Sequence, residues 1–450
     1  MIGRLVATTV ATALLPLLFV LLATLHLHAA AAQGRPDVRT DERDVKVILG
    51  AAVRFDAIYQ DSFYRSGSGK GFEFISAYFR LDIDFRFNDD GGVFASLATR
   101  RRDFNGSFGS GFPRTQGAVV GSENPTLEID ELFVEIRRMF NLDIAIRAGL
   151  AHFNLGVDTS ADKLWEGHGS LWFDTRHGRG PAAFDRMHPI GIQARLSPER
   201  ALTFDGWAAY LNRDLSNDAN TVYITAVQAT LTLESKATPV TGLQTPLNTG
   251  YKAAFIGGYA RWFDQNGPDM EVIWAGLRLA ASPEVMVYGE AAFEFGNEFS
   301  GEAAYGGFRY TFPDGAAFID VSFWLLTGDD PLTFSKQEGF VSYGSISTTL
   351  AVDSADFGMG RHTNYSALKV FGSWRLDYHI RLQVAYANYN SQDSDSDGSP
   401  GQEIDAFFIY EAFAHVQVRA GGAYLFDSRI RAPATNPDGW LFMVSVLGDF

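Results

Sequence analysis

Period-two alternation of apolar and polar residues constrains the fold of this chain more than any other feature. Every odd position from 45 to 59 is apolar, with charged or small residues at most positions between. The segment 79–88 alternates five apolar residues with Arg80, Asp82, Asp84, Arg86 and Asn88. Successive side chains of a β-strand point to opposite faces, so both segments predict strands with one apolar face. A single strand of this kind suits a soluble sandwich and a transmembrane barrel equally well.

The connections between the alternating segments separate these two folds. Tight turns are predicted at 88–92, 197–200, 282–284 and 313–315, where Gly, Pro, Asp and Asn gather. Long connections rich in Gly, Ser, Asp and aromatic residues fall between them, at 102–125, 152–189, 328–363 and 391–401. Bacterial outer-membrane barrels have short periplasmic turns and longer external loops. The alternation of short and long connections therefore favours a barrel.

Counting the strands tests this interpretation. Candidate strands begin near residues 45, 72, 93, 127, 142, 190, 202, 222, 252, 271, 285, 302, 316, 364, 379, 403, 415 and 440. These are about 18 strands, an even number, as bacterial single-chain barrels have. The segment 222–233 is the weakest, and keeping it makes 234–250 an unusually long periplasmic connection. We predict an all-β transmembrane antiparallel barrel over residues 33–450, with both termini in the periplasm.

The two ends of the sequence agree with export to the outer membrane of a Gram-negative bacterium. Residues 1–32 have one arginine, a long apolar stretch and a small-residue Ala-x-Ala site, the layout of a secretory signal peptide. A retained anchor helix is the alternative for this segment. At the other end, Phe442 to Phe450 form an amphipathic strand that closes on an aromatic residue. Such an ending resembles the signal recognised by the barrel-assembly machinery, which we expect as a partner beside outer-membrane lipid.

Composition excludes several other classes of protein. The chain has 53 acidic and 37 basic residues, and its net charge of −16 argues against a nucleic-acid partner. It has no cysteine, which excludes disulfides and thiolate chemistry. Neither a Gly-x-Ser-x-Gly elbow nor a His-Glu-x-x-His helix is present. We therefore expect no enzyme, although a catalytic barrel with scattered Ser, His and Asp groups stays an alternative, as does a non-transporting adhesin.

Three sets of segments stand out as motifs: Leu132 to Ile136 with Ile146 to Leu150, Thr327 to Pro331 with Asn364, and Glu403 to Asp405 with Tyr410 and Val416 to Tyr424. Together they resemble the alginate-export family of outer-membrane barrels. The resemblance implies an 18-stranded barrel that exports an acidic polysaccharide or acts as a porin. The family's usual Gly-Arg-Gln after the early hairpin is replaced here by Gly149-Leu150-Ala151, so the cargo stays open.

If the apolar faces of the strands meet lipid, the charged faces line the lumen. The predicted pore-lining residues are Arg54, Arg80, Asp82, Asp84, Arg86, Arg137, Arg147, Lys369, Arg375 and Arg381. A planar guanidinium pairs two carboxylate oxygens, so these arginines would suit an anionic solute. They could equally pair with the carboxylates between them and only fill the wall.

Two of the long connections carry further candidate sites. Trp165, Trp172, Phe173 and Arg176 could contact sugar rings or form a constriction if their loop folds inward, while the nearby histidines match no zinc pattern. Asp393, Asp395 and Asp397 with Gly398 resemble the first half of a calcium loop, although Glu403 comes one position early for its closing ligand. We expect no cofactor, apart from structural Ca²⁺ in this loop as an alternative to a solvated acidic loop.

The sequence thus predicts an outer-membrane channel for transport of anionic solutes, with an acidic polysaccharide among the candidates for its cargo. A general diffusion porin for small solutes is the main alternative. These two functions differ in what the lumen admits, which depends on side-chain contacts inside the barrel.

Overall fold

A computed structural model covers the whole chain. The structure describes residues 45–61, 72–87, 91–99, 106–107, 127–137, 144–151, 153–156, 173–174, 188–199, 201–212, 221–234, 252–264, 269–296, 298–328, 339–340, 349, 352, 364–391, 401–413, 416–426 and 439–449. The predicted signal peptide, residues 1–32, lies outside them. No helix in this described part is long and apolar enough to cross a membrane.

Most of the described residues form β-strands. The first strands are β1 (Val45–Asp61), β2 (Phe72–Phe87), β3 (Gly91–Thr99), β5 (Leu127–Ile136), β6 (Ile144–Leu150), β9 (His188–Glu199) and β10 (Leu202–Asn212). They are followed by β11 (Thr221–Glu234), β12 (Lys252–Asp264), β13 (Met270–Ala280), β14 (Val285–Phe295), β15 (Glu302–Thr311) and β16 (Ala317–Leu326). The last are β17 (Tyr365–Arg375), β18 (Ile380–Asn390), β19 (Gly401–Phe413), β20 (Val416–Phe426) and β21 (Gly439–Asp449), with two-residue strands β4 (Gly106–Ser107), β7 (Asn154–Leu155) and β8 (Phe173–Asp174) between the long ones.

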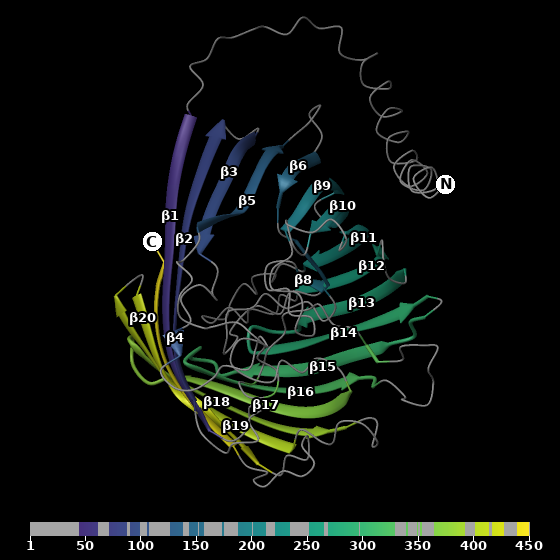
Figure 1. Cartoon of the computed structure of the whole chain (residues 1–450). Helices are drawn as coiled ribbons and strands as arrows, with labels where there is room; N and C mark the ends of the chain where they lie inside the picture. The colour runs from purple at the N-terminus through teal and green to yellow at the C-terminus, as the bar shows by residue number, and fades with distance from the viewer. Residues whose placement is uncertain are drawn as a thin grey trace, which may run out of the picture.

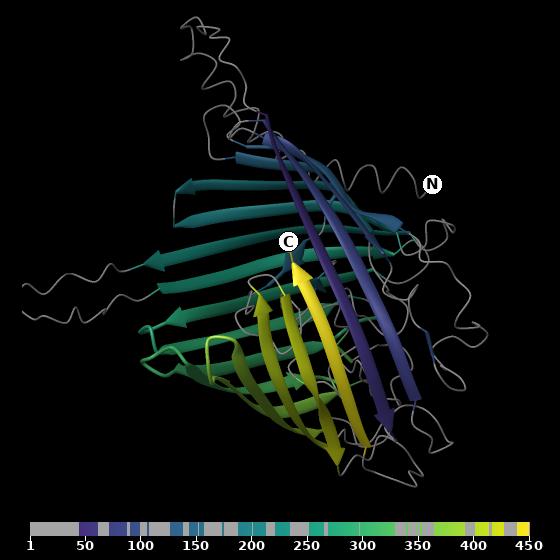
Figure 2. The same cartoon turned by 90° about the vertical axis from the view of Figure 1, so that its left-hand side faces the viewer.

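The long strands close into a single antiparallel barrel (Figure 1). The main sheet has 19 strands, and one of them, β4, pairs only with β2. The remaining 18 pair with their neighbours along the chain, and β21 closes the ring on β1 with Val53 opposite Gly448. Figure 2 shows this seam, where the purple first strand lies beside the yellow last strand. Closure pairs every strand edge, which a sheet inside a lipid bilayer requires.

The structure confirms the predicted fold class and strand count. Each of the 18 predicted strands is present, and each begins within two residues of its predicted start. The weakest prediction, 222–233, is β11, which pairs over its length with β10 and β12. The long connection predicted after it falls at residues 235–251, outside the described residues.

One face of most of the long strands carries exposed apolar side chains, which together form a band around the barrel. This band includes Phe79, Ile192, Phe204, Val227, Phe255, Ile273, Phe293, Phe308, Phe323, Leu368, Phe408 and Phe442. Residues one position away point to the opposite face, which we call the inner face. An apolar band around a closed barrel is the surface that meets the hydrocarbon of a membrane. The protein is therefore a transmembrane β-barrel.

The inner face differs on one side from the expected polar lumen. From β10 to β21 many inward side chains are apolar and buried, among them Trp207, Val222, Ile224, Trp262, Met270, Val272, Trp274, Trp324, Phe407 and Met443. The same packed cluster includes Phe153, Leu155, Phe340 and Val352, which lie between the long strands of the barrel. These four side chains pack inside the barrel and need apolar partners there. For this reason these strands carry apolar residues on both faces.

Candidate functional site: the barrel interior

The charged wall of the barrel begins on β2. Phe79 and Phe85 are exposed on its outer face, and the inner face carries Arg80, Asp82, Asp84 and Arg86. Arg80 Nε donates to Asp82 at 2.7 Å, and its Nη2 lies 3.4 Å from Glu131 of β5. Arg86 Nε donates to Asp84 at 2.7 Å. The two predicted pore-lining arginines of β2 therefore pair with carboxylates on the inner wall.

Two arginines share one carboxylate at the next position along the wall. Arg137 and Arg147 each donate from Nε to a different oxygen of Glu135. Arg147 comes from β6, where the register places it directly opposite Glu135. Its guanidinium also lies over the ring of Phe133, 4.8 Å from the centroid. The group has two positive charges and one negative charge, and both guanidiniums are partly exposed.

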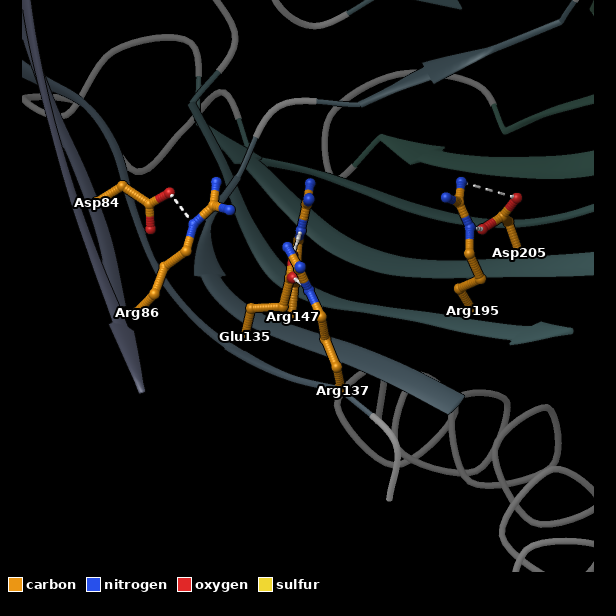
Figure 3. Close-up of polar contacts among 7 residues, drawn as sticks. All are labelled: Asp84, Arg86, Glu135, Arg137, Arg147, Arg195 and Asp205. Carbon is orange, nitrogen blue, oxygen red and sulfur yellow. Dashed lines mark hydrogen bonds and ion pairs between the residues drawn. The ribbon is translucent and has the colours of Figure 1, made fainter. Parts of the chain in front are cut away.

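The wall continues with a bidentate pair between β9 and β10. Arg195 donates to both oxygens of Asp205, from Nε at 2.6 Å and from Nη2 at 3.3 Å. Figure 3 shows Arg86, the Glu135 group and this pair lying along one wall of the barrel. Asp205 is buried, whereas the Arg195 side chain is about half exposed.

Further arginines come from the later strands, close to the tight turns. They are Arg278, Arg309, Arg375, Arg381 and Arg419, each within four residues of the strand end that faces a short connection. Arg309 contacts Asp320 at 3.0 Å and Arg381 contacts Glu411 at 3.2 Å. Arg278 donates to Met286, and Arg419 donates to Gln417. We call these residues, with Arg86, Arg137, Arg147 and Arg195, the turn-end arginines.

Sequence reasoning missed Arg195, Arg278, Arg309 and Arg419 among the turn-end arginines. Each stands in an alternating segment, so the same pattern that selected Arg80 and Arg86 could have found them. The predicted pore-lining residues lie mostly on the first strands, where charges of both signs are densest. The structure adds arginines on later strands to the predicted Arg375 and Arg381, because nearly every short connection between described strands has an arginine beside it.

Other predicted pore-lining residues have different surroundings. Lys369 is only 4% exposed, and its ammonium lies 4.3 Å from the ring centroid of Trp324 and 5.4 Å from those of Tyr365 and Tyr389. It is therefore packed under aromatic rings. Arg375 is exposed at the end of β17. Arg54 lies opposite Tyr78 and Leu447 by register, and its side chain is outside the described part.

The described residues of the connection between β16 and β17 contact the inner wall. The backbone N–H of Val352 donates to the Glu403 carboxylate at 3.0 Å, and the hydroxyls of Thr349 and Tyr389 lie 2.6 Å apart. The N–H of Phe340 donates to the carbonyl of Thr327 at 3.1 Å. Val352 and Phe340 are almost fully buried. Polar contacts to the wall thus hold these inward residues.

A second inward segment follows β6. Phe153 stacks on Trp207 with 5.7 Å between ring centroids, and Leu155 is fully buried. The N–H of Gly156 donates to Gln228 Oε1 at 3.0 Å. The same amide oxygen accepts from Trp274 Nε1 at 3.2 Å. Both inward segments dock on apolar residues of the interior, and the second one adjoins the charged wall, because Trp207 of β10 lies opposite Gln193 of β9.

The candidate residues in the long connections are largely outside the described residues. This holds for Trp165, Trp172 and Arg176 and for the acidic residues Asp393, Asp395 and Asp397. Phe173 forms β8, which pairs with β7, and its side chain is not described. Among the described residues, no group of three His, Asp or Glu side chains could hold a metal ion. Glu403 lies in β19, fully buried, where it accepts from Val352 as part of the barrel wall.

Comparison with solved structures supports the barrel fold. The chain is similar to crystal structures of Pseudomonas aeruginosa OpdG (OccK9), OprD and OpdQ, with TM-scores of 0.55, 0.53 and 0.52 and identities of 11%, 10% and 12%. These matches cover 90%, 90% and 89% of this chain and 99%, 95% and 98% of the matched chains. No protein-family model matches the sequence, and no curated protein matches it.

At this level of identity the likeness shows the fold, that of outer-membrane porin barrels. It spans almost the full length of each matched chain, so the whole barrel is shared. The narrower resemblance to alginate exporters receives no support from these structures. The solute must therefore be argued from the side chains inside this barrel.

Proposed function

We propose that the protein is a channel for small solutes across the outer membrane and that it favours anions. The turn-end arginines carry this proposal. They lie on the inner face near the tight-turn end, which is the periplasmic end in barrels of this kind. Charges that line a narrow opening with low-dielectric walls focus the field on passing ions, even when the whole protein has the opposite charge.

The inward segments support small solutes over a polymer. Phe153 and Leu155 from one connection and Phe340 and Val352 from another pack inside the barrel. Chain that fills part of the lumen narrows the passage. An acidic polysaccharide stays the second candidate, because guanidinium groups also suit the carboxylates of uronate polymers.

Conductance in a planar lipid bilayer tests this function. We expect the refolded barrel to conduct, with a reversal potential in a KCl gradient that shows anion selectivity. Added uronate polymer should not block the current if only small solutes pass, whereas concentration-dependent block would favour the polysaccharide. Cation selectivity would contradict the role of the turn-end arginines. An absence of conductance would contradict a channel altogether and favour the catalytic or adhesin alternatives.

The partners follow from the same proposal. Outer-membrane lipid contacts the apolar outer band, and the barrel-assembly machinery inserts the chain through its C-terminal strand. We propose no cofactor for transport. Structural Ca²⁺ at Asp393, Asp395 and Asp397 is a separate proposal, which a change in thermal stability on adding Ca²⁺ or a chelator would test.

A further inference from the structure

We propose that the inner wall holds a binding subsite for a small carboxylate with a hydroxyl group on the neighbouring carbon. Arg147, Gln193 and Trp207 form this subsite. The inference rests on the proposed function, since it assumes that solutes pass along the charged wall. It specifies the chemical class of solute that binds to this wall and the side chains that bind it.

The strand register places these side chains in one row. Glu135 lies opposite Arg147, Arg147 opposite Gln193, and Gln193 opposite Trp207. Residues directly opposite each other in antiparallel strands point to the same face, with Cβ atoms about 4.5–5.5 Å apart. The row therefore crosses β5, β6, β9 and β10 on the inner face. It joins the double-arginine group to the indole of Trp207.

The charge of the row suits a carboxylate. Among the ion pairs described on the inner face, Arg137 and Arg147 are the two cations that share one carboxylate, Glu135. Each engages Glu135 through Nε, and their side chains are 49% and 38% exposed. A guanidinium has further N–H donors in the same plane, arranged to pair a carboxylate. An entering carboxylate would balance the excess positive charge.

The other end of the row offers a donor and an acceptor. Trp207 is 6% exposed, and its Nε1 has no hydrogen-bond partner in the described part of the chain. Gln193 Oε1, on the directly opposite residue, is also buried without such a partner. Buried polar groups are nearly always satisfied. A hydroxyl group satisfies both, because it accepts from the indole N–H and donates to the amide oxygen.

The surroundings limit the size of the ligand. Phe153, which belongs to the second inward segment, stacks on Trp207 and covers one face of its ring at this end of the row. The space beside the indole therefore suits a hydroxyl group better than a bulky substituent. A 2-hydroxy acid has its carboxylate and hydroxyl on adjacent carbons. Its carboxylate would meet Arg147, and its hydroxyl would reach Gln193 and Trp207.

Lactate and propionate provide the test, because they differ by one hydroxyl group. Both are added to the refolded full-length barrel in a planar bilayer, and the concentration that half-blocks the chloride current is measured. We expect lactate to block at a concentration about tenfold lower than propionate, since a site built to bond a hydroxyl rejects the analogue without it. Trp207→Phe keeps the ring without its N–H, and Gln193→Leu removes the amide. Either change should bring the two acids to equal blocking concentrations.

Arg86→Gln is the matched control, because it removes a wall arginine outside the row. We expect it to weaken block by both acids while the preference for lactate persists. Equal block of the unmodified barrel by the two acids would overturn the subsite, as would a preference that survives both row variants. If the KCl gradient shows no anion selectivity, the proposed function itself fails. Anion selectivity without preference for lactate refutes the subsite alone.

Discussion

The backbone N–H of Val352 donates a hydrogen bond to the buried carboxylate of Glu403 at 3.0 Å. Glu403 is part of the barrel wall in β19, and Val352 lies in the connection between β16 and β17. A contact between two residues that are 51 positions apart in the sequence thus holds an inward segment against the wall. A hydrogen bond to a charged acceptor contributes about 1.5–3 kcal/mol, so this contact strongly affects how fully the segment stays docked.

Removing this acceptor should widen the channel. We expect Glu403→Leu to raise the single-channel conductance and to add current fluctuations, because the segment around Val352 loses its bond to the wall. Glu403→Gln is the control, since its amide keeps an oxygen that accepts the same N–H. Conductance recordings at equal salt compare the two variants. Equal conductance in Glu403→Leu and the unmodified barrel would show that this contact does not set the width of the passage.

The carboxylate shared by two arginines should limit anion selectivity. We expect Glu135→Gln to raise the chloride-to-potassium permeability ratio about fivefold. One unit charge about 8 Å from a passing ion in water contributes about 0.5 kcal/mol, with opposite sign for chloride and for potassium. The reversal potential in a KCl gradient measures this ratio. Asp84→Asn is a comparison variant, since it removes the carboxylate of a pair with one arginine. A shift toward cation selectivity in Glu135→Gln would contradict the placement of Arg137 and Arg147 beside the passage.

The aromatic rings around Lys369 should stabilise the barrel. A desolvated cation over an aromatic face contributes about 2 kcal/mol, and Lys369 lies close to three rings. We expect Lys369→Met to lower the free energy of unfolding by about that amount. Urea unfolding in lipid vesicles, followed by tryptophan fluorescence, measures it. Lys46→Met, at an exposed position near the start of β1, should leave the stability nearly unchanged. Equal stability of both variants would exclude a stabilising role for Lys369.

The sequence alone predicts the barrel well. Period-two alternation identifies strands such as β2, and the predicted turns at 88–92 and 313–315 indicate where strands end. These are local signals, because side chains alternate in any strand and Gly, Asp and Asn mark tight turns. Even β11, with its weak pattern, is found because the strand count must be even.

The interior is predicted less completely, because it depends on contacts between distant residues. The charged face of Arg80 and Arg86 is found from alternation alone. Nothing in the sequence near Glu403 indicates that its carboxylate accepts from Val352, because strand register and the path of the connection bring them together. The burial of Lys369 has a similar cause, since Trp324, Tyr365 and Tyr389 come from three strands. Alternation assigns a side chain to a face without showing what covers it.

Two neighbouring glycines of β12 should respond differently to the same substitution. A Cβ added to Gly258 would lie 2.1 Å from the Trp274 ring on the inner face, while one added to Gly257 would meet only the Trp274 carbonyl oxygen, 4.0 Å away. Trp274 is 1% exposed and donates to Gln228, so its ring has little room to move. We therefore expect Gly258→Ala to destabilise the barrel by about 1–3 kcal/mol through overpacking.

Gly257→Ala should instead leave the stability unchanged or raise it by up to about 1 kcal/mol, because alanine loses less conformational freedom on folding. Urea unfolding of both variants in lipid vesicles gives the comparison. Gly258→Ala, but not Gly257→Ala, should also loosen the second inward segment. The reason is that Gln228 accepts hydrogen bonds from both Trp274 and Gly156. A displaced Trp274 would disturb that shared acceptor, and conductance would then rise together with the loss of stability. Equal stability of the two variants would show that the Trp274 ring can move away from Gly258 without cost.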